Sequence, residues 1–144
     1  MSIEPKNIKN PNRFSDTRIA HQLEHAEDYV EIILDLIEEN GEARLLDIAK
    51  RIGVAHPTAA KTLKKIQKEG LVNIQPYRSI ELTRKGKILA NECRHRHEIV
   101  LKFLIAIGVD SKTAQIDSEG MEHHVSPKTL KIMQKFINSN ASID

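Results

Sequence analysis

The chain has 144 residues, of which 40% are hydrophobic and 29% charged, as in a soluble globular protein of one or two small domains. Aromatic residues make up only 3% and Trp is absent, which argues against an aromatic cage or a base-stacking platform. No apolar run approaches the roughly 20 residues of a membrane helix, no signal peptide is evident, and the single Cys93 excludes a disulfide framework. These features predict a cytoplasmic protein.

The net charge of +2 hides a strong asymmetry along the chain. Residues 21–40 contain seven acidic residues and no Lys or Arg, whereas residues 44–90 contain eleven basic residues against three acidic ones, a local net charge of +8. A basic block of this kind favours binding to a polyanion. The acidic block before it indicates either a cation site or a solvated face.

Hydrophobic periodicity and helix-ending residues predict a mainly helical chain. Residues 1–20 are polar and are predicted to form a flexible arm. Thr83 and Ser126 are predicted to cap the helices that follow them, the second with Pro127 in its first turn. The predicted elements are helices over 21–40, 45–52 and 56–69, a hairpin of 71–74 and 80–82, a long helix over about 83–107, and short helices over about 111–123 and 126–138.

The order helix, short helix, turn, second helix and basic hairpin is that of a winged helix-turn-helix. In this fold the helix after the turn enters the major groove of DNA and the hairpin, or wing, touches the backbone. The predicted core face of that helix is Ala60, Leu63, Ile66 and Gln67, with Ala59 assisting. The predicted contacts with double-stranded DNA are His56, Pro57, Thr58, Ala59, Lys61, Thr62, Lys65, Tyr77 and Arg78. Exposed lysines often serve only solubility, but the element order, the wing and the local charge all favour DNA binding.

Acidic residues and histidines recur at helical spacing. On the first helix His21, Glu24, Asp28, Glu31 and Asp35 share a face without Lys or Arg, so like charges repel unless a cation binds. The stretch "DSEGMEHHVS" repeats this pattern near the C-terminus. The predicted metal ligands are Asp28, Glu31, His97, Glu119, Glu122 and His123. Carboxylates with imidazoles suit Mn²⁺ or Fe²⁺, and six ligands exceed the need of one ion, which favours two ions. The alternatives are a solvated acidic face and, for His97, a half-buried structural histidine.

The motifs of the common enzyme classes are missing from the sequence. "EGMEHH" is neither H-E-x-x-H nor H-x-x-E-H, no Ser–His or Cys–His motif has an evident partner, and no Gly-rich phosphate loop is present. Carboxylate-rich sites with two metal ions can hydrolyse phosphates. A helical chain with a winged helix-turn-helix is a poor setting for that chemistry, so no catalytic residues are predicted.

The motifs "EDYVE", "RHEIVLKFLIAIGVD" and "EGMEHHVS", in this order and spacing, resemble the manganese transport regulators, the manganese-sensing branch of the diphtheria-toxin-repressor superfamily. The resemblance covers about residues 21–137 and is strongest to the Gram-negative form. It implies a homodimer whose chains each have an N-terminal winged-helix domain and a C-terminal helical dimerisation domain, joined by the long helix. It also implies a dinuclear Mn²⁺ site between the domains, formed by the six ligands named above.

We therefore predict a Mn²⁺-activated transcriptional repressor that binds palindromic operators of manganese-uptake genes, with no membrane or small organic ligand as partner. The predicted domains are the arm 1–20, the winged helix-turn-helix domain 21–83, and the helical metal-binding and dimerisation domain 84–144. One alternative is the same architecture responding to Fe²⁺ or Zn²⁺, and another is a metal-independent DNA-binding protein. Cys93 is predicted to be a small buried apolar residue, and His124 either orients a ligand or lies at the surface.

Overall fold

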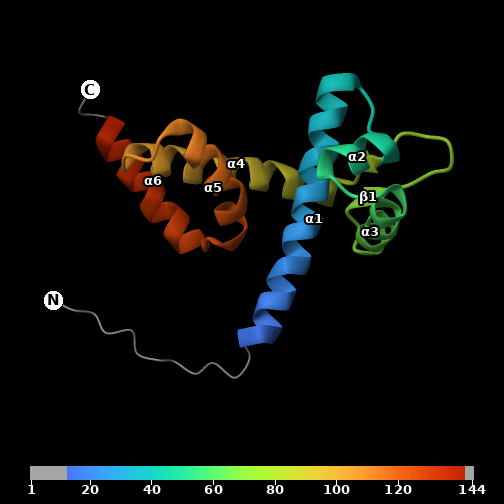
Figure 1. The fold of residues 1–144 in the computed structure, drawn as a ribbon, viewed down its shortest axis with the longest axis horizontal. Helices are drawn as coiled ribbons and strands as arrows, with labels where there is room; N and C mark the ends of the chain where they lie inside the picture. The colour runs from blue at the N-terminus through green and yellow to red at the C-terminus, as the bar shows by residue number, and fades with distance from the viewer. Residues whose placement is uncertain (1–12, 142–144) are drawn as a thin grey trace.

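The computed structural model describes residues 13–141, with side chains from residue 24 to residue 140. Helices dominate this part of the chain and a short two-stranded sheet accompanies them (Figure 1). The elements are α1 (Arg13–Asn40), α2 (Leu45–Ile52), α3 (His56–Lys68), β1 (Val72–Asn73), β2 (Glu81–Leu82), α4 (Arg84–Ala106), α5 (Ser111–Met121), the 3-10 turn η1 (Glu122–His124) and α6 (Pro127–Ala141). None of the helices within residues 13–141 combines the length and the apolar character needed to cross a membrane.

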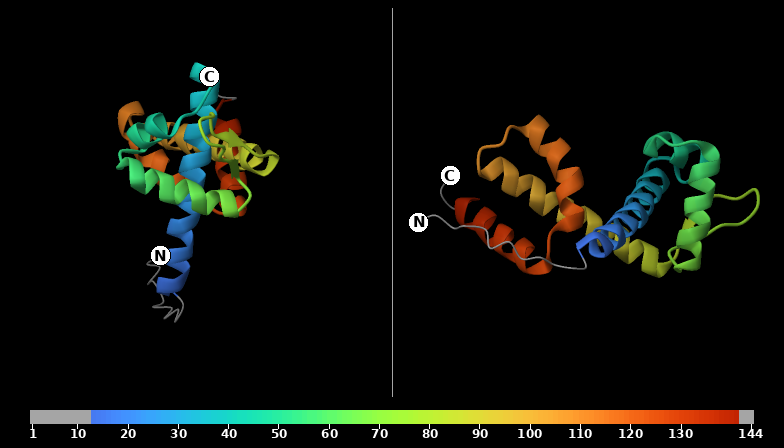
Figure 2. Two further views of the ribbon diagram at one scale, coloured as in Figure 1. Left: turned by 90° about the vertical axis from the view of Figure 1, so that its right-hand side faces the viewer. Right: turned by 60° about the horizontal axis from the view of Figure 1, so that its bottom comes forward.

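The chain packs into two lobes around two separate hydrophobic cores. The first core gathers apolar residues of α1, α2, α3 and both strands, and the second gathers those of α4, α5 and α6. α4 belongs to both, because Ala90 is buried in the first core while Val100 and Leu104 are buried in the second. Figures 1 and 2 show α4 running from one lobe to the other and passing α1 on the way. The prediction of two helical units joined by a long helix is confirmed.

α2 and α3 form the predicted helix-turn-helix. Gly53 ends α2 with φ 83°, a left-handed conformation that glycine adopts without a steric penalty, and its N–H donates to the carbonyl oxygen of Ala49. α3 begins at His56 with Pro57 in its first turn, where the missing N–H leaves no helical hydrogen bond unmade. The turn between the two helices is therefore determined by local sequence.

The buried face of α3 is rotated relative to the prediction. Ala59, Leu63 and Ile66 are buried, and Ala60 is partly buried. Gln67 is exposed, so its assignment to the core face was wrong. Ala59 lies four residues before Leu63 and shares a face with it and with Ile66, and this stripe faces the first core, which turns Gln67 toward solvent.

The wing is a minimal hairpin. Val72 pairs with Leu82 and Asn73 with Glu81 in antiparallel register, so each strand is shorter than predicted. At the tip, Tyr77 has φ 61° and a fully exposed side chain. The wing therefore projects from the first lobe as a loop on a short base.

The start of α4 is packed closely against the base of the wing. Thr83 caps α4 by accepting a hydrogen bond from the Gly86 N–H, as predicted. A Cβ atom at Gly86 would lie 2.1 Å from the carbonyl oxygen of Leu71, a distance that no side chain could occupy. The close approach of these two backbones sets the direction in which the long helix leaves the first lobe. Ser126 caps α6 in a similar way, accepting from the Thr129 N–H at 3.2 Å.

α1 is longer than predicted. It begins at Arg13, so residues 13–20 belong to a helix, and their assignment to a flexible arm was wrong. The chain contains neither Gly nor Pro between Pro11 and Gly41, so no residue of that stretch breaks the helix. Residues 1–12 and the side chain of His21 lie outside the described part of the chain.

Candidate metal centre and DNA-binding surface

α1 presents two different faces along the same turns. One face buries Tyr29 and Val30 in the first core. The opposite face carries Asp28 and Glu31, whose charged neighbours include residues of η1 and α5 in the second lobe. Because the apolar face of α1 is packed into the first lobe, any group that binds these carboxylates is also attached to that lobe.

The second lobe contributes further donors from three elements. His97 of α4 has its Nδ1 atom 3.7 Å from Oε1 of Glu122 in η1 and 4.0 Å from Oε1 of Glu119 in α5. The Glu122 side chain is fully buried, yet neither of its oxygens has a hydrogen-bond partner in the described structure, and the same holds for His97 Nδ1. A buried polar atom without a partner costs about 1–3 kcal/mol. These atoms therefore fit a bound cation, which would satisfy all of them.

His123 connects the two lobes. Its side chain is only 1% exposed; Nδ1 lies 2.7 Å from Glu27 Oε2 and Nε2 lies 2.9 Å from Asp28 Oδ1. The Nδ1 contact is a hydrogen bond, whereas the Nε2 atom has no partner in hydrogen-bond geometry. With Nδ1 donating to Glu27, loss of the proton on Nε2 would leave the lone pair of that atom free to coordinate a cation. Metal-binding histidines are held in this way, with one nitrogen donating to a carboxylate and the other coordinating.

Two groups of donors result, and the candidate ligand atoms within each group lie within 4.8 Å of one another: Glu24, Asp28 and His123 in one, and His97, Glu119 and Glu122 in the other. The groups adjoin, since His123 Nε2 is 3.7 Å from Glu122 Oε1. Glu31 interacts electrostatically with Asp28 of the first group and Glu119 of the second. The structure thus brings five of the predicted ligands into two adjoining groups and places the sixth, Glu31, beside both.

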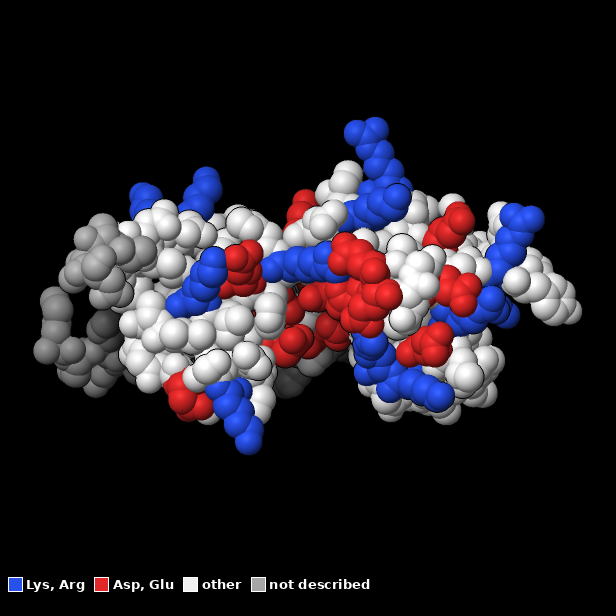
Figure 3. Space-filling model, turned by 90° about the horizontal axis from the view of Figure 1, so that it is seen from above, with Lys and Arg blue, Asp and Glu red and all other residues white. Residues whose placement is uncertain are grey.

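Glu31 and Glu122 of the cluster hold protons more strongly than a carboxylate in water does. Burial, followed by repulsion from Glu119, raises the pKa of Glu31 to about 7, and burial with repulsion from Glu31 raises the pKa of Glu122 to about 8. Burial lowers the pKa of His123, but the carboxylates of Asp28 and Glu27 outweigh it and raise that pKa to about 10. Figure 3 shows acidic side chains gathered where the two lobes meet. The cluster therefore requires positive charge, from protons or from a cation.

Two residues that hold the cluster, Glu27 and Arg96, were not predicted from the sequence. Glu27 is 8% exposed and binds both His123 and Arg96, whose Nη2 donates to Glu27 Oε2 at 2.5 Å. Burial raises the pKa of Glu27, but the hydrogen bond from His123 and the charge of Arg96 lower it overall. An acidic residue between the apolar positions of α1 was the available signal, because such a residue needs a partner when it is buried.

Cys93 does not belong to either donor group. Its side chain is fully buried, burial raises the pKa of its thiol to about 12, and it contacts Arg96 Nη2 at 3.3 Å. The prediction of a small buried residue is confirmed. The candidate metal centre of the described residues therefore consists of carboxylates and imidazoles without a thiolate.

The predicted DNA-binding residues lie mainly on one exposed region of the first lobe. Those of α3 other than Ala59 are exposed or, for Thr62, partly exposed, and Tyr77 and Arg78 are exposed at the wing tip. α3 and the wing line the same cavity of about 410 Å³, to which Lys64 of α3 and the wing residues Tyr77 and Arg78 contribute. α3 and the wing therefore form one surface that carries positive charge.

Ala59 is the exception among these residues. Its side chain is completely buried in the first core beside Leu63 and Ile66. It cannot reach a base edge, so its assignment as a DNA contact was wrong. The sequence places it near the N-terminal end of α3, but the rotation of the helix decides which side of that end faces outward.

A winged helix-turn-helix lobe, joined by a long helix to a helical lobe, with a partly buried donor cluster at the junction, defines a metal-dependent transcriptional repressor rather than an enzyme. Residues 21–80 match the N-terminal DNA binding domain of the iron dependent repressors, and residues 83–142 match their metal binding and dimerisation domain. The chain belongs to the iron dependent repressor family. It therefore binds DNA through its first domain and forms dimers through its second.

Individual transcriptional regulators are similar to this protein over most of the chain. The transcriptional regulator MntR of Escherichia coli O157:H7 is 47% identical over 129 residues, which cover 90% of this chain and 83% of that protein. The HTH-type transcriptional regulator MntR of Bacillus subtilis (strain 168) is 42% identical over 100 residues, 69% of this chain and 70% of that protein. The resemblance predicted from the sequence is confirmed by these matches.

Solved structures show the same fold. The manganese regulator SloR is 30% identical with a TM-score of 0.70, and the match covers 78% of this chain and 53% of that one. A manganese-dependent transcriptional repressor in complex with manganese is 26% identical with a TM-score of 0.71, covering 78% of this chain and 52% of that one. The matched region thus spans about half the length of these solved chains.

Proposed function

We propose that this chain is a transcriptional repressor activated by Mn²⁺. The proposal rests on one observation: three buried donors without hydrogen-bond partners lie beside the carboxylates of α1. These donors are Glu122, His97 Nδ1 and His123 Nε2. The names of the similar proteins, transcriptional regulator MntR and manganese regulator SloR, support manganese as the metal.

We assign two ions to each chain. Asp28 and His123 would hold one ion, and His97, Glu119 and Glu122 would hold the other, with Glu31 between them. The support for two ions is the presence of two adjoining donor groups. Sets of carboxylate oxygens with one imidazole suit Mn²⁺ better than they suit metals that prefer thiolates.

The cluster would control the relative placement of the two lobes. When bound, the metal supplies the positive charge that neutralises the cluster. Until then Glu31, Glu119 and Glu122 repel one another across the junction. With repulsion removed, the carboxylates of α1 hold the first lobe against η1 and α5, and the apolar face of α1 carries this restraint to the core under α3. A coupling of roughly 1–3 kcal/mol, which changes DNA affinity about 5- to 150-fold, is enough for a switch.

The surface formed by α3 and the wing would read DNA. We propose base contacts from residues near the start of α3 (His56, Pro57, Thr58 and Thr62) and backbone contacts from Lys61, Lys65, Tyr77 and Arg78. A two-fold symmetric dimer presents two such surfaces, which fits a palindromic operator with half-sites one helical turn apart. We further propose domain limits at 21–83 and 84–144, action in the cytoplasm, and manganese-uptake genes as targets.

Fe²⁺ is the second candidate activator. The description of the family as iron dependent repressors favours it, and Fe²⁺ accepts the same oxygen and nitrogen donors. Zn²⁺ also binds such donors, so it belongs in the same test. The protein would have the same architecture and would respond to a different metal.

The test is operator binding measured by fluorescence anisotropy. Labelled duplexes from upstream of the protein's own gene and of a neighbouring transporter gene are titrated with protein in chelator, then in Mn²⁺, Fe²⁺ (anaerobically) and Zn²⁺. Binding that is tight only with Mn²⁺ supports the proposal, and tight binding with only another metal replaces Mn²⁺ by that metal. Equal binding in chelator would exclude metal activation.

A matched pair of histidines on α4 tests the site. The His97→Gln variant should lose the metal response, while the variant His95→Gln should keep it, because His95 is exposed on the same helix and lies outside both donor groups. A metal response retained in His97→Gln would remove His97 from the site.

A further inference from the structure

We propose that Glu24 is an additional metal ligand, supplied by α1 one turn before Asp28 and positioned by His124. The inference rests on the proposed function and extends the ligand set by one residue. Glu24 shares the face of α1 with Asp28, four residues later. Its ligand atom lies within 4.8 Å of those of Asp28 and His123.

A second observation points to a ligand at this position. The His123 side chain is 1% exposed, and its Nε2 atom is buried without a hydrogen-bond partner in the described structure. His123 belongs to the same group as the Glu24 and Asp28 carboxylates, and its Nε2 atom lies 2.9 Å from Asp28 Oδ1. Two carboxylates of α1 alone would be a solvated surface, but a buried nitrogen beside them makes a site with both oxygen and nitrogen donors. Such a set coordinates a divalent cation.

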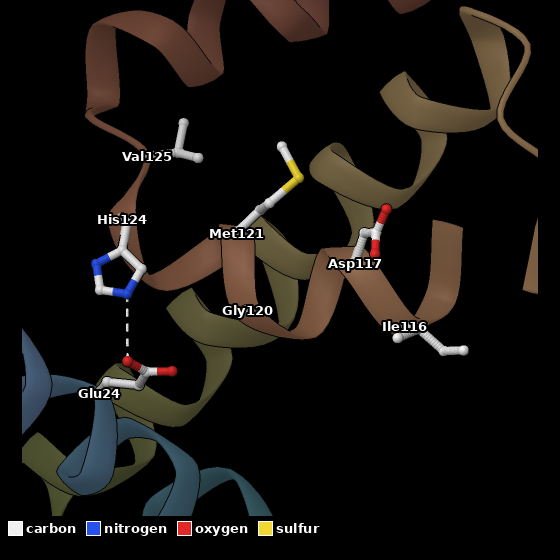
Figure 4. Close-up of a pocket in the computed structure, with 7 residues that line it drawn as sticks. All are labelled: Glu24, Ile116, Asp117, Gly120, Met121, His124 and Val125. Atoms are coloured by element: carbon white, nitrogen blue, oxygen red, sulfur yellow. Dashed lines mark hydrogen bonds and ion pairs between the residues drawn. The ribbon is translucent and has the colours of Figure 1, made fainter. Parts of the chain in front are cut away.

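His124 holds Glu24 in place. The two neighbouring histidines of η1 each meet a carboxylate of α1: His123 Nδ1 lies 2.7 Å from Glu27 Oε2, and His124 Nε2 lies 3.2 Å from Glu24 Oε2. Figure 4 shows the His124 ring pointing directly at the Glu24 carboxylate, across the space between η1 and α1. The hydrogen bond fixes the Glu24 side chain against the second lobe. A ligand held in this way loses little additional freedom when the ion binds.

Glu24 would extend the restraint on α1 toward α3. The next residues, His25 and Ala26, line a cavity of about 100 Å³ together with Thr62 and Lys65 of α3. The turn of α1 that carries Glu24 is therefore the turn that adjoins the proposed DNA-reading helix. Coordination by Glu24 would hold this turn directly, whereas Glu31 acts about 10 Å further along the helix.

The surroundings of Glu24 offer a matched control. A cavity of about 720 Å³ lies beside the pair and is lined by Glu24, His124, Asp117 and the apolar side chains of Ile116, Met121 and Val125. Figure 4 shows Asp117 on the far side of this cavity from the Glu24–His124 pair. Asp117 is exposed and lies outside both donor groups. Its substitution removes a negative charge from the same cavity and leaves the proposed ligands unchanged.

The experiment titrates the full-length dimer with Mn²⁺ and measures the free ion by electron paramagnetic resonance. The difference between added and free Mn²⁺ gives the number of bound ions. In Glu24→Gln we expect the affinity for one of the two ions to fall by roughly 10- to 100-fold, with the other unchanged. His124→Gln should weaken the same ion by a smaller factor, and Asp117→Asn should stay within about twofold of the wild type, as expected for a distant, screened charge. Circular dichroism in chelator checks that each variant keeps its helical content.

Each outcome decides between the two proposals. If the wild type binds no Mn²⁺, the proposed function fails. If the wild type binds Mn²⁺ and Glu24→Gln binds it equally well, only the role of Glu24 is overturned. An equal loss in Asp117→Asn also overturns that role, because net charge alone would then explain it. If Glu24→Gln loses helical content, the Mn²⁺ affinity of His124→Gln decides the role of Glu24. A weakened affinity for one ion supports that role, and an affinity equal to that of the wild type overturns it.

Discussion

Two of the polar contacts that join α1 to the second half of the chain differ in the source of their positive charge. Toward the end of α1, Arg94 of α4 binds the carboxylates of Asp35 and Glu38, with Arg94 Nη1 2.9 Å from Glu38 Oε1. About 10 Å earlier on the helix, the carboxylates of Asp28 and Glu31 have no Arg or Lys partner among the described residues. One contact contains an arginine, which is always charged, whereas the other needs protons or a cation from solution.

The difference explains how the lobes can stay joined and still respond to metal. The Arg94 contact persists without metal because its cation is covalently part of the chain. The contact at Asp28 and Glu31 is stable only when a cation or protons offset the repulsion among the carboxylates. We infer that the Arg94 contact between α1 and α4 is present in both states, and that the metal restricts how the two lobes are oriented relative to each other. The predictions below test this comparison.

The largest effect is expected for Glu122→Gln, which removes a fully buried carboxylate. Operator binding in Mn²⁺ should weaken by at least about 10- to 100-fold. In chelator the variant should be more stable than the wild type by about 1–3 kcal/mol at pH 8. The reason is that burial raises the pKa of Glu122 from 4.5 to about 8, so wild-type stability is lost as the pH rises through that range.

Urea unfolding in chelator at pH 5 and pH 8 measures this difference. The gain should be small at pH 5, where the native wild-type carboxyl group is protonated, and largest at pH 8. A variant that is less stable than the wild type at pH 8 would mean that Glu122 already has a stabilising partner in the absence of metal.

Metal binding should release protons. At pH 7 without metal, Glu31, Glu122 and His123 have pKa values of about 7, 8 and 10, so they retain protons that a cation would displace. We expect release of about one proton or more per chain, and a Mn²⁺ affinity that falls as the pH is lowered from 8 to 6. Calorimetric titration in two buffers of different ionisation enthalpy reports the number of protons. Identical enthalpies in both buffers would contradict the prediction.

A smaller effect is expected for Arg94→Gln. The Arg94, Asp35 and Glu38 side chains are 32%, 38% and 55% exposed, so solvent screens the contact and its loss should cost about 1 kcal/mol or less. The Mn²⁺ affinity should remain within a few fold of the wild type. Urea unfolding and metal titration measure the two quantities. Lys102→Gln, which breaks an exposed pair within α4, is the control. A lost metal response in Arg94→Gln would show that the two contacts are not separate.

The smallest effect is expected for Lys65→Gln on α3. Removing one phosphate contact should reduce the slope of log affinity against log salt by about 0.9 and weaken all operators equally. Lys128→Gln, an exposed change on α6, should leave the slope unchanged. Anisotropy titrations at several salt concentrations give the slope. An unchanged slope for Lys65→Gln would remove this residue from the DNA surface and leave the metal centre untouched.

Local signals predicted most of the fold. α2 was predicted at its observed limits of Leu45–Ile52, and Thr83 was predicted as the cap of α4, because amphipathic spacing and capping chemistry act within a few residues. Ala59 and Gln67 were misplaced because a small rotation of a short helix exchanges buried and exposed positions. Only packing against the first core decides that rotation.

The sequence by itself determined the two lobes, the order of their elements and the residue types available to a metal. It did so because helical periodicity, caps and like-charge clustering are properties of neighbouring residues. Only the tertiary structure decided that Glu27 supports His123 and Arg96, which lie 96 and 69 residues away, and that Glu24 lies beside His123 and His124. These contacts depend on how α1 packs against η1 and α4, and no local pattern encodes that arrangement.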